Sequence, residues 1–148
     1  MRLWRISRYR GLGGEGGLHA DSRWHHAPRH VLFAAEHSAL AMLEVLAHLQ
    51  IDLAQMPSTL RLIAIDIKPR ASISLAPSLP SGWQANLPTT QALGNAWLDA
   101  SKSLLLRIPS GLLPHANNYA INPRHRQART HLSESDQGPL WIDPRFAR

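Results

Sequence analysis

The stretch SRWHHAPRHVLFAAEHSALAMLEVLAHL, residues 22–49, is the most informative part of this chain. A 3.6-residue period predicts a helix over 38–49 with one apolar stripe, on which Glu44 lies between apolar positions. Those apolar positions are Leu40, Leu43 and Ala47. Because burying an unpaired carboxylate is costly, Glu44 either reaches water at the edge of the stripe or lines a cleft. Arg23 is its nearest candidate partner in sequence.

Length and composition set the broad class of the protein. The chain has 148 residues, of which 44% are hydrophobic, so we expect one domain over 1–148 with a sizeable core. Cysteine is absent, which excludes disulfides and thiolate sites. No stretch approaches the roughly eighteen apolar residues that span a bilayer, and no signal peptide is evident. We therefore expect a soluble, cytoplasmic protein without a membrane partner.

The net charge of +6 comes almost entirely from arginine. The arginines are scattered and do not form the dense basic run with interleaved aromatics that favours binding to single-stranded nucleic acid. Guanidinium groups also suit phosphorylated ligands and acidic partner proteins. The charge pattern thus argues against direct binding to nucleic acid.

Short apolar or alternating runs predict strands over 3–7, 29–33, 60–67, 103–108 and 118–121. Prolines and serines over 69–88 predict an irregular connection, and 140–142 is expected to be a final docking segment of the polar tail. Strands and helices do not alternate regularly. We therefore predict an α+β fold with a small mixed or antiparallel β core and few helices.

A second helix is predicted where apolar residues recur at helical spacing, at Leu93, Trp97 and Leu98. Thr89 or Thr90 is the expected N-cap of this helix. The glycine-rich segment over 11–17 follows a predicted strand, but its spacing is not GxGxxG. It is interpreted as a flexible loop.

Histidine and serine side chains are further candidates for a chemical role. His25, His26 and His30 lie close together, yet neighbours in extended chain point to opposite sides and no HExxH motif is present. We therefore predict polar loop residues or contacts to an anionic ligand, and no metal site. Ser110, in RIPSG, follows a strand and a proline, so its hydroxyl either caps a turn or faces a cleft.

Several short strings occur in a specific order along nearly the whole chain: LWRI at 3–6, GGL at 16–18, SRW at 22–24, VLFAA at 31–35, ALAMLEVLAHL at 39–49, LGNAWL at 93–98, LLLRIPS at 104–110 and NYAINPRH at 118–125. With these strings the chain resembles the RES-domain family, the toxin halves of bacterial Xre-RES toxin–antitoxin pairs, which is similar in fold to ADP-ribosyltransferases. The resemblance implies a toxin that degrades NAD by hydrolysis or phosphorolysis and arrests growth. It also implies a cognate Xre-type antitoxin, through which any nucleic-acid contact would run, and no metal cofactor.

The resemblance also implies roles for individual residues. Arg23 would bind the anionic part of NAD, with Arg5 as a further ligand contact. Glu44 would bind a ribose hydroxyl and stabilise the positive charge that develops as nicotinamide leaves, and Ser110 would position ribose or nicotinamide. Phe33 would keep a stacking face against NAD where family members commonly carry tyrosine, but it lacks a hydroxyl donor worth about 0.5–1.5 kcal/mol.

Two alternatives follow from the same residues. The site could transfer ADP-ribose to a cellular protein instead of to water or phosphate. Alternatively, the loss of the tyrosine hydroxyl at Phe33 and the basic surface suit a catalytically weak binding module.

Overall fold

The fold, shown by a computed structural model that describes residues 1–146, is built on a seven-stranded sheet with the order β4-β5-β6-β2-β1-β3-β7. Its strands are β1 (Arg2–Ser7), β2 (Leu32–Ala35), β3 (Arg61–Ile67), β4 (Ile73–Leu75), β5 (Leu105–Pro109), β6 (Asn117–Ile121) and β7 (Leu132–Pro139). The α-helices are α1 (Ser38–Leu49), α2 (Leu87–Ala100) and α3 (Ala128–His131), and short 3-10 turns are η1 (Glu15–Leu18), η2 (Leu53–Gln55), η3 (Trp83–Ala85) and η4 (Pro144–Phe146). Within the described residues only β4 and β5 pair in parallel, so the predicted α+β class with a mixed sheet is confirmed.

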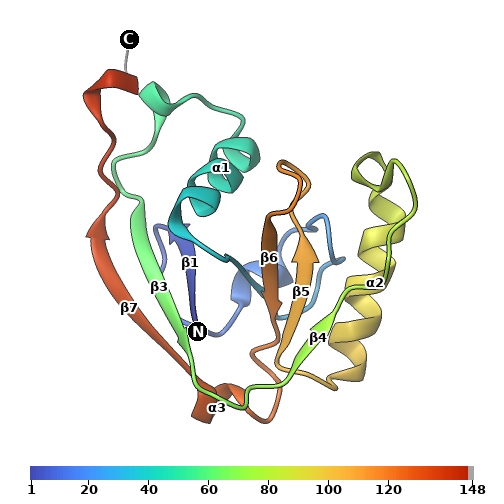
Figure 1. The fold of residues 1–148 in the computed structure, drawn as a ribbon. Helices are drawn as coiled ribbons and strands as arrows, with labels where there is room; N and C mark the ends of the chain where they lie inside the picture. Colours follow the sequence, from blue (N-terminus) through green and yellow to red (C-terminus); the bar gives the residue numbers. More distant parts are fainter. Residues whose placement is uncertain (147–148) are drawn as a thin grey trace.

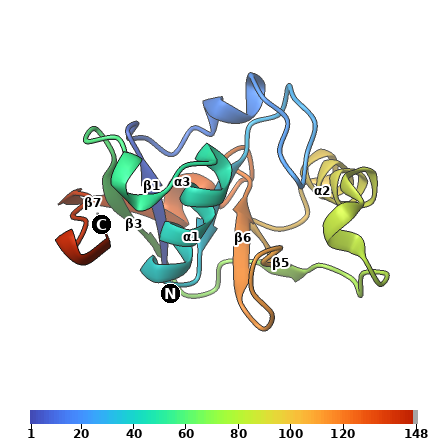
Figure 2. The ribbon, with the colours of Figure 1, turned by 90° about the horizontal axis from the view of Figure 1, so that it is seen from above.

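The sheet has a seam between β1 and β2. Those two strands meet in a single registered pair, Trp4 with Ala35, whereas β1 and β3 pair along the whole of β1. The sheet therefore consists of two halves, β7-β3-β1 and β2-β6-β5-β4, which stand apart in the ribbon view (Figure 1). Helix α1 contacts both strands of the seam, whereas α2 lies beside the half made of β2, β6, β5 and β4 (Figure 2).

A shared hydrophobic core holds the two halves together. Leu3 and Ile65 from one half pack in one cluster with Leu105 and Ile121 from the other, and all four are almost fully buried. Burial of such side chains stabilises each by roughly 1.5–3 kcal/mol relative to exposure. The seam can thus lack backbone pairing because side-chain packing closes it from one face.

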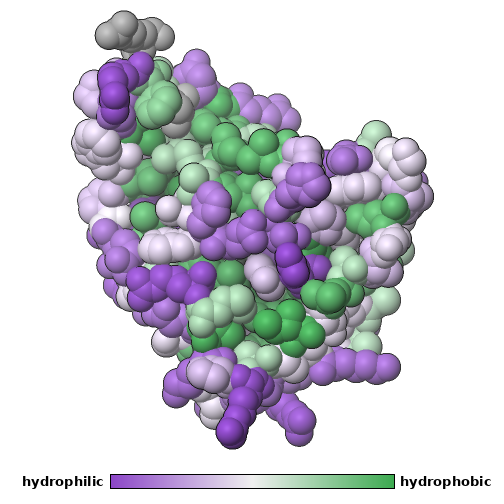
Figure 3. Space-filling model, in the orientation of Figure 1, coloured by the Kyte–Doolittle hydropathy of each residue, from purple (hydrophilic) through white to green (hydrophobic). Residues whose placement is uncertain are grey.

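The surface on the face of Figure 1 is divided in polarity. Polar side chains cross the middle of this face and separate apolar patches above and below them (Figure 3). Among the exposed apolar residues are Leu43 on α1 and Leu112 beyond β5, which are 40% and 45% exposed. The apolar side chains on this face thus form separate patches and no continuous band.

Helix α1 has the predicted bounds, but the predicted apolar stripe is wrong. Leu40 and Ala41 are buried, whereas Leu43 and Ala47 are exposed. The reason is that α1 packs only its beginning against β1 and β2, so its later turns rise away from the sheet. Within residues 1–146, no helix combines the length and the apolar character needed to cross a membrane.

Three predictions about strands need correction. The predicted irregular connection over 69–88 contains β4, and the strand predicted over 29–33 instead covers Leu32–Ala35. The polar tail contains β7, whose sequence LSESDQGP carries no apolar alternation. Strand β7 lies at the edge of the sheet and pairs with β3 through the backbone, so polar side chains are tolerated there. Leu140 then donates a backbone hydrogen bond to Leu60, so the predicted docking segment begins with a real contact.

The predicted N-cap of α2 is also wrong. Asn86 caps the helix, because its side chain accepts a hydrogen bond from the backbone N–H of Thr89 at 3.4 Å. Pro88 lies in the first turn, where its missing N–H costs nothing. Thr90 is fully buried within the helix and is used for a contact to Arg23.

Candidate active site

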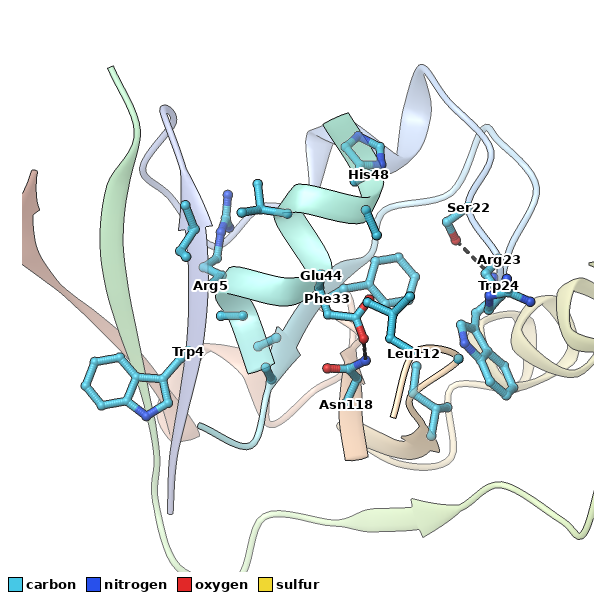
Figure 4. A pocket seen from close by; sticks show the side chains of 18 of the residues that line it. Trp4, Arg5, Ser22, Arg23, Trp24, Phe33, Glu44, His48, Leu112 and Asn118 are labelled. Atoms are coloured by element: carbon cyan, nitrogen blue, oxygen red, sulfur yellow. Dashed lines mark hydrogen bonds between the residues drawn. The ribbon is translucent and has the colours of Figure 1, made fainter. Parts of the chain in front are cut away.

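A cavity of about 480 Å³ lies at the seam of the sheet. Its walls come from α1, β1, β2, β5, β6 and the segment around Arg23 (Figure 4). The volume is in the range of small-molecule sites in proteins. Four of the five residues predicted to act on NAD line it, namely Arg5, Arg23, Phe33 and Glu44.

Glu44 is held by two donors on one of its carboxylate oxygens. Its Oε1 accepts hydrogen bonds from Ser110 Oγ at 2.9 Å and from Asn118 Nδ2 at 2.7 Å. Hydrogen bonds to a charged group are about twice as strong as neutral ones. Within residues 1–146 no hydrogen bond reaches Oε2 of Glu44, so this oxygen can accept one from a ligand. Of the two positions left open for Glu44, the structure shows the cleft.

Ser110 caps the turn after β5 and does not itself line the cavity, so its predicted contact with ribose or nicotinamide stays a prediction. It is buried directly after β5, and its Oγ accepts backbone hydrogen bonds from Leu112 at 3.0 Å and Leu113 at 3.3 Å. The same hydroxyl donates its proton to Glu44. The turn after Pro109 therefore fixes the hydroxyl rotor, and the fixed rotor orients the carboxylate. Ser110 supports the cavity wall through Glu44.

Sequence reasoning did not single out Asn118, although it lies in the NYAINPRH string. Asn118 is on β6 and pairs with Ala35 of β2 and Ile108 of β5. It shares a face of β6 with buried Ala120, so a polar residue stands at an inward position of an apolar strand. That signal, the same one that marked Glu44, could have identified it.

Arg23 does not pair with Glu44, so that expectation from the sequence is wrong. Its Nη1 donates to the carbonyl oxygen of Gln84 at 2.7 Å, and its guanidinium carbon lies 5.8 Å from the centre of the Trp83 ring. The close-up shows Arg23 and Glu44 on separate walls of the cavity (Figure 4). The Glu44 carboxylate already accepts a hydrogen bond from Asn118, and the Arg23 guanidinium already donates to the β4–α2 loop. Neither group therefore requires the other as an ion-pair partner. An anionic ligand can therefore reach Arg23 without breaking an ion pair.

Helix α2 supports the backbone that carries Arg23. Thr90 Oγ1 donates to the carbonyl oxygen of Arg23, and Gln91 Nε2 donates to that of Ser22 at 2.9 Å. Gly94 of the same helix lies so close to the carbonyl of Trp24 that a Cβ atom there would collide with it. The segment with Arg23 is thus packed tightly against α2 although it belongs to a loop.

Arg5 lies on β1 at the other side of the cavity (Figure 4). Burial lowers the pKa of its guanidinium from the usual value, while the nearby charges of Glu134 and Glu15 act in the opposite direction. Its two terminal nitrogens donate to the carbonyl oxygens of Gly11 and Tyr9, each at 3.3 Å. Arg5 therefore anchors the loop after β1, and its contact with a ligand stays a prediction.

The Phe33 ring lies in the cavity and packs on His25, whose side chain is hydrogen-bonded within the fold. The Phe33 and His25 ring centres are 6.0 Å apart at an interplanar angle of 46°. His25 is buried, with Nε2 at 3.0 Å from the carbonyl oxygen of Gly17 and Nδ1 at 2.6 Å from Ser22 Oγ. Both nitrogens are thus used within the fold. In the part of the chain that the structure describes, no group of three or more histidine, aspartate or glutamate residues is arranged to hold a metal ion.

The sequence profile described as "RES domain" matches residues 2–143. The chain belongs to the RES-domain family. The resemblance drawn from the ordered strings is therefore confirmed. Similar proteins include "Toxin Res" of Pseudomonas putida, 47% identical over 130 residues that cover 88% of this chain and 90% of the relative. "Toxin Res" of Yersinia enterocolitica is 35% identical and covers 99% of this chain and 95% of the relative. "Prs ADP-ribosylating toxin" of a Sphingobium species is 29% identical and covers 93% and 87%.

A solved structure shares the fold of this RES-domain chain. It is a chain of the crystal structure of the M. tuberculosis MbcT–MbcA toxin–antitoxin complex, with a TM-score of 0.67 and 18% identity. The match covers 93% of this chain and 84% of that chain. The predicted fold class thus agrees with a known toxin structure.

The RES-domain strings converge on the cavity. LWRI contributes Arg5, SRW contributes Arg23, VLFAA contributes Phe33 and ALAMLEVLAHL contributes Glu44. The same helix adds His48 one turn beyond Glu44, a residue that sequence reasoning did not select. Segments that lie far apart in sequence therefore form one site in this family member.

Proposed function

We propose that this RES-domain chain is the toxin of a toxin–antitoxin pair and that it cleaves the nicotinamide–ribose bond of NAD in the cytoplasm, depleting NAD and arresting growth. One observation carries the proposal. Glu44 presents a free carboxylate oxygen in a cavity of ligand size while its other oxygen is held by Ser110 and Asn118. The names of the relatives support a toxin, and the chemistry of the cavity supports the reaction.

The residues suit a reaction that develops positive charge. When the bond between ribose C1 and the nicotinamide nitrogen breaks, its electron pair leaves with nicotinamide as a neutral molecule, and an oxocarbenium-like ribose remains. The fixed Glu44 carboxylate stabilises that charge, and its Oε2 accepts a hydrogen bond from a ribose hydroxyl. Arg23 binds the pyrophosphate, and the Phe33 ring packs against the nicotinamide end. Attack by water with loss of its proton gives ADP-ribose, whereas attack by phosphate gives ADP-ribose phosphate.

The test is nicotinamide release by the purified protein, with products identified in the presence and absence of phosphate. Glu44→Gln removes the charge with little change of shape, and Arg23→Met removes the cation. Both should lose most of the activity, because each group acts on a charge of the substrate. Asp52→Asn, a neutralised carboxylate on an exposed residue away from the cavity, should keep it. Equal rates in all variants would overturn the assignment of Glu44 and Arg23, and no release by the unaltered protein would overturn the reaction.

A second candidate function is transfer of ADP-ribose to a cellular protein. The observation in its favour is the similarity to the relative named "Prs ADP-ribosylating toxin". NAD labelled in its adenylate half distinguishes the two reactions. Label retained on a protein from a cell extract supports transfer, whereas label found only in free products supports degradation.

Two further expectations, an antitoxin partner and a weak catalytic site, have tests of their own. A neighbour in fold was solved in a toxin–antitoxin complex, so we expect a cognate antitoxin, of the Xre type, to restore growth on co-expression. If the Phe33→Tyr variant, like the unaltered protein, bound an acidic partner without any turnover of NAD, the binding-module hypothesis would replace the enzyme.

A further inference from the structure

The net charge of the chain is unevenly distributed along its sequence. Residues 67–133 contain seven lysines and arginines but one acidic residue, Asp99, whereas the rest of the chain has nine basic and nine acidic residues. Asp99 is already neutralised, because its two carboxylate oxygens accept hydrogen bonds from Arg29 at 2.9 and 3.0 Å. The whole formal charge of +6 thus comes from residues 67–133.

The sheet brings five of these cations to one of its ends. Its register pairs Ile67 with Leu132, and Leu105 with both Ile73 and Ile121. These positions are where β3 and β6 finish and where β4, β5 and β7 begin. The connecting segments at this end carry the five cations that we call the basic end surface, namely Lys68, Arg70, Lys102, Arg126 and Arg129. This end is the lower one in Figure 1, around α3.

Hydrogen bonds join the segments that carry the basic end surface. The backbone N–H of Lys68 donates to the carbonyl oxygen of His131 at 2.9 Å, and Gln127 Nε2 donates to that of Arg70 at 3.2 Å. The segment before β5 belongs to the same framework, because the Asn122 side chain donates to it at 3.0 Å. The register and these contacts thus place the five cations at one end of the molecule, where hydrophilic side chains project in Figure 3.

Among the described residues, the five cations have no partner of opposite charge. All are exposed, and within residues 1–146 their side chains form neither a hydrogen bond nor an ion pair. Asp66, which precedes Lys68 on β3, is bound by Arg2 at 2.8 Å. Because like charges held together repel, this surface favours a partner that supplies several negative charges at once.

The composition of the basic end surface favours phosphates over a protein partner. Protein interfaces are typically centred on apolar and aromatic side chains. The connecting segments 68–72, 101–104 and 122–131 contain no Phe, Tyr or Trp, and none of the large exposed hydrophobic residues lies in them. The same lack of aromatic rings disfavours unpaired bases, which bind by stacking. A duplex backbone, in contrast, is bound through its phosphates by cations.

We propose that the basic end surface binds the phosphate backbone of double-stranded DNA without reading its sequence. The arginines are scattered in the linear sequence, which argued against nucleic acid, but the fold gathers them at one end of the sheet. Ser110 and Asn118, which hold Glu44, lie at the opposite ends of β5 and β6. The inference is therefore independent of the proposed cleavage of NAD.

The experiment measures the binding of a fluorescently labelled DNA duplex to the full chain by anisotropy at several salt concentrations. The logarithm of the association constant should fall linearly with that of the salt concentration, with a slope of about −0.9 for each phosphate neutralised. Arg126→Gln with Arg129→Gln should make the slope less negative by about 1.8, whereas lysine at both positions should preserve it. The matched control is Arg8→Gln with Arg10→Gln. It removes the same charge from exposed residues beyond Ser7, at the other end of the sheet, and should leave the slope unchanged.

Duplexes of two unrelated sequences should bind equally, and the Arg126→Gln, Arg129→Gln variant should keep its rate of nicotinamide release, which separates this surface from the Glu44 cavity. Failure to bind the duplex at low salt, or an equal change of slope in the variant and the control, would overturn the inference. Tighter binding of a single strand, of an RNA duplex or of poly-glutamate would also overturn it, and the last would indicate an acidic protein partner. If NAD is not cleaved but the duplex binds with the expected salt dependence, the proposed function fails and this inference stands.

Discussion

Removing the Asn118 amide should reduce catalysis by loosening Glu44. In Asn118→Ala the carboxylate loses its 2.7 Å hydrogen bond and keeps only the one from Ser110. A hydrogen bond to a charged group contributes about 1.5–3 kcal/mol. If most of that energy serves to orient the carboxylate toward the transition state, kcat should fall by about tenfold to hundredfold. The KM for NAD should change less, because Asn118 holds Glu44 equally before and after the substrate binds.

The assay is nicotinamide release at saturating NAD, with the free energy of unfolding measured by urea denaturation on the same samples. Asn95→Ala is the matched control, because the Asn95 side chain is likewise hydrogen-bonded, through two bonds to His26, but lies on α2 away from the cavity. It should lower stability without changing kcat.

A double-mutant cycle tests the route by which Asn118 acts. In a Glu44→Gln background, Asn118→Ala should cost little further activity, because residues that act as one unit are not additive. A full additional loss in that background, or an unchanged kcat in the single variant, would refute the view that Asn118 works by holding Glu44.

Three further outcomes are expected. If the cavity lacks only the tyrosine hydroxyl, Phe33→Tyr should raise kcat by up to about tenfold, because that is the contribution of one neutral hydrogen bond. Nicotinamide release measures the change. Gly94→Ala should lower the midpoint of thermal unfolding and nicotinamide release together, because its Cβ would collide with the Trp24 carbonyl, whereas Gly16→Ala meets open space. Burial lowers the pKa of His125, so protonation favours the unfolded chain, and the free energy of unfolding should fall as the pH drops below about 6.5. Urea denaturation across that pH range should show that the free energy of unfolding changes less with pH in His125→Asn.

The parts of the fold that were predictable are those in which local pattern and environment agree. The beginning of helix α1 is apolar and packs on the sheet, and β3 is an apolar run that pairs with a strand on each side. Strand β7 was not predicted, because it is defined by its backbone pairing with β3 and its polar side chains give no sign of that pairing. The three-residue β4 escaped for a similar reason, since it is short and lies at the other edge.

The same distinction holds for the site. A charge at an inward helical position marked Glu44 before any contact was known. The partners of that charge come from the turn after β5 and from β6, more than sixty positions further along the chain, and no spacing rule connects them. Arg23 shows the complementary error, because it was taken as the nearest candidate partner of Glu44 in sequence, whereas in space it contacts Gln84 and Trp83.

The seam of the sheet has a consequence for the order in which the protein is made. One wall of the Glu44 cavity is β1, which precedes the other six strands along the chain, yet the half-sheet of β1 gains its outer strand only with residues 132–139. Until then the outer edge of β3 has no neighbour, and the two halves share one backbone pair. A growing chain can therefore contain Arg23, Glu44, Ser110 and Asn118 without holding them firmly in one cavity. If the chain is a toxin, its active form is completed only after residues 132–139 have been made, which gives the producing cell an interval before the finished protein must be restrained.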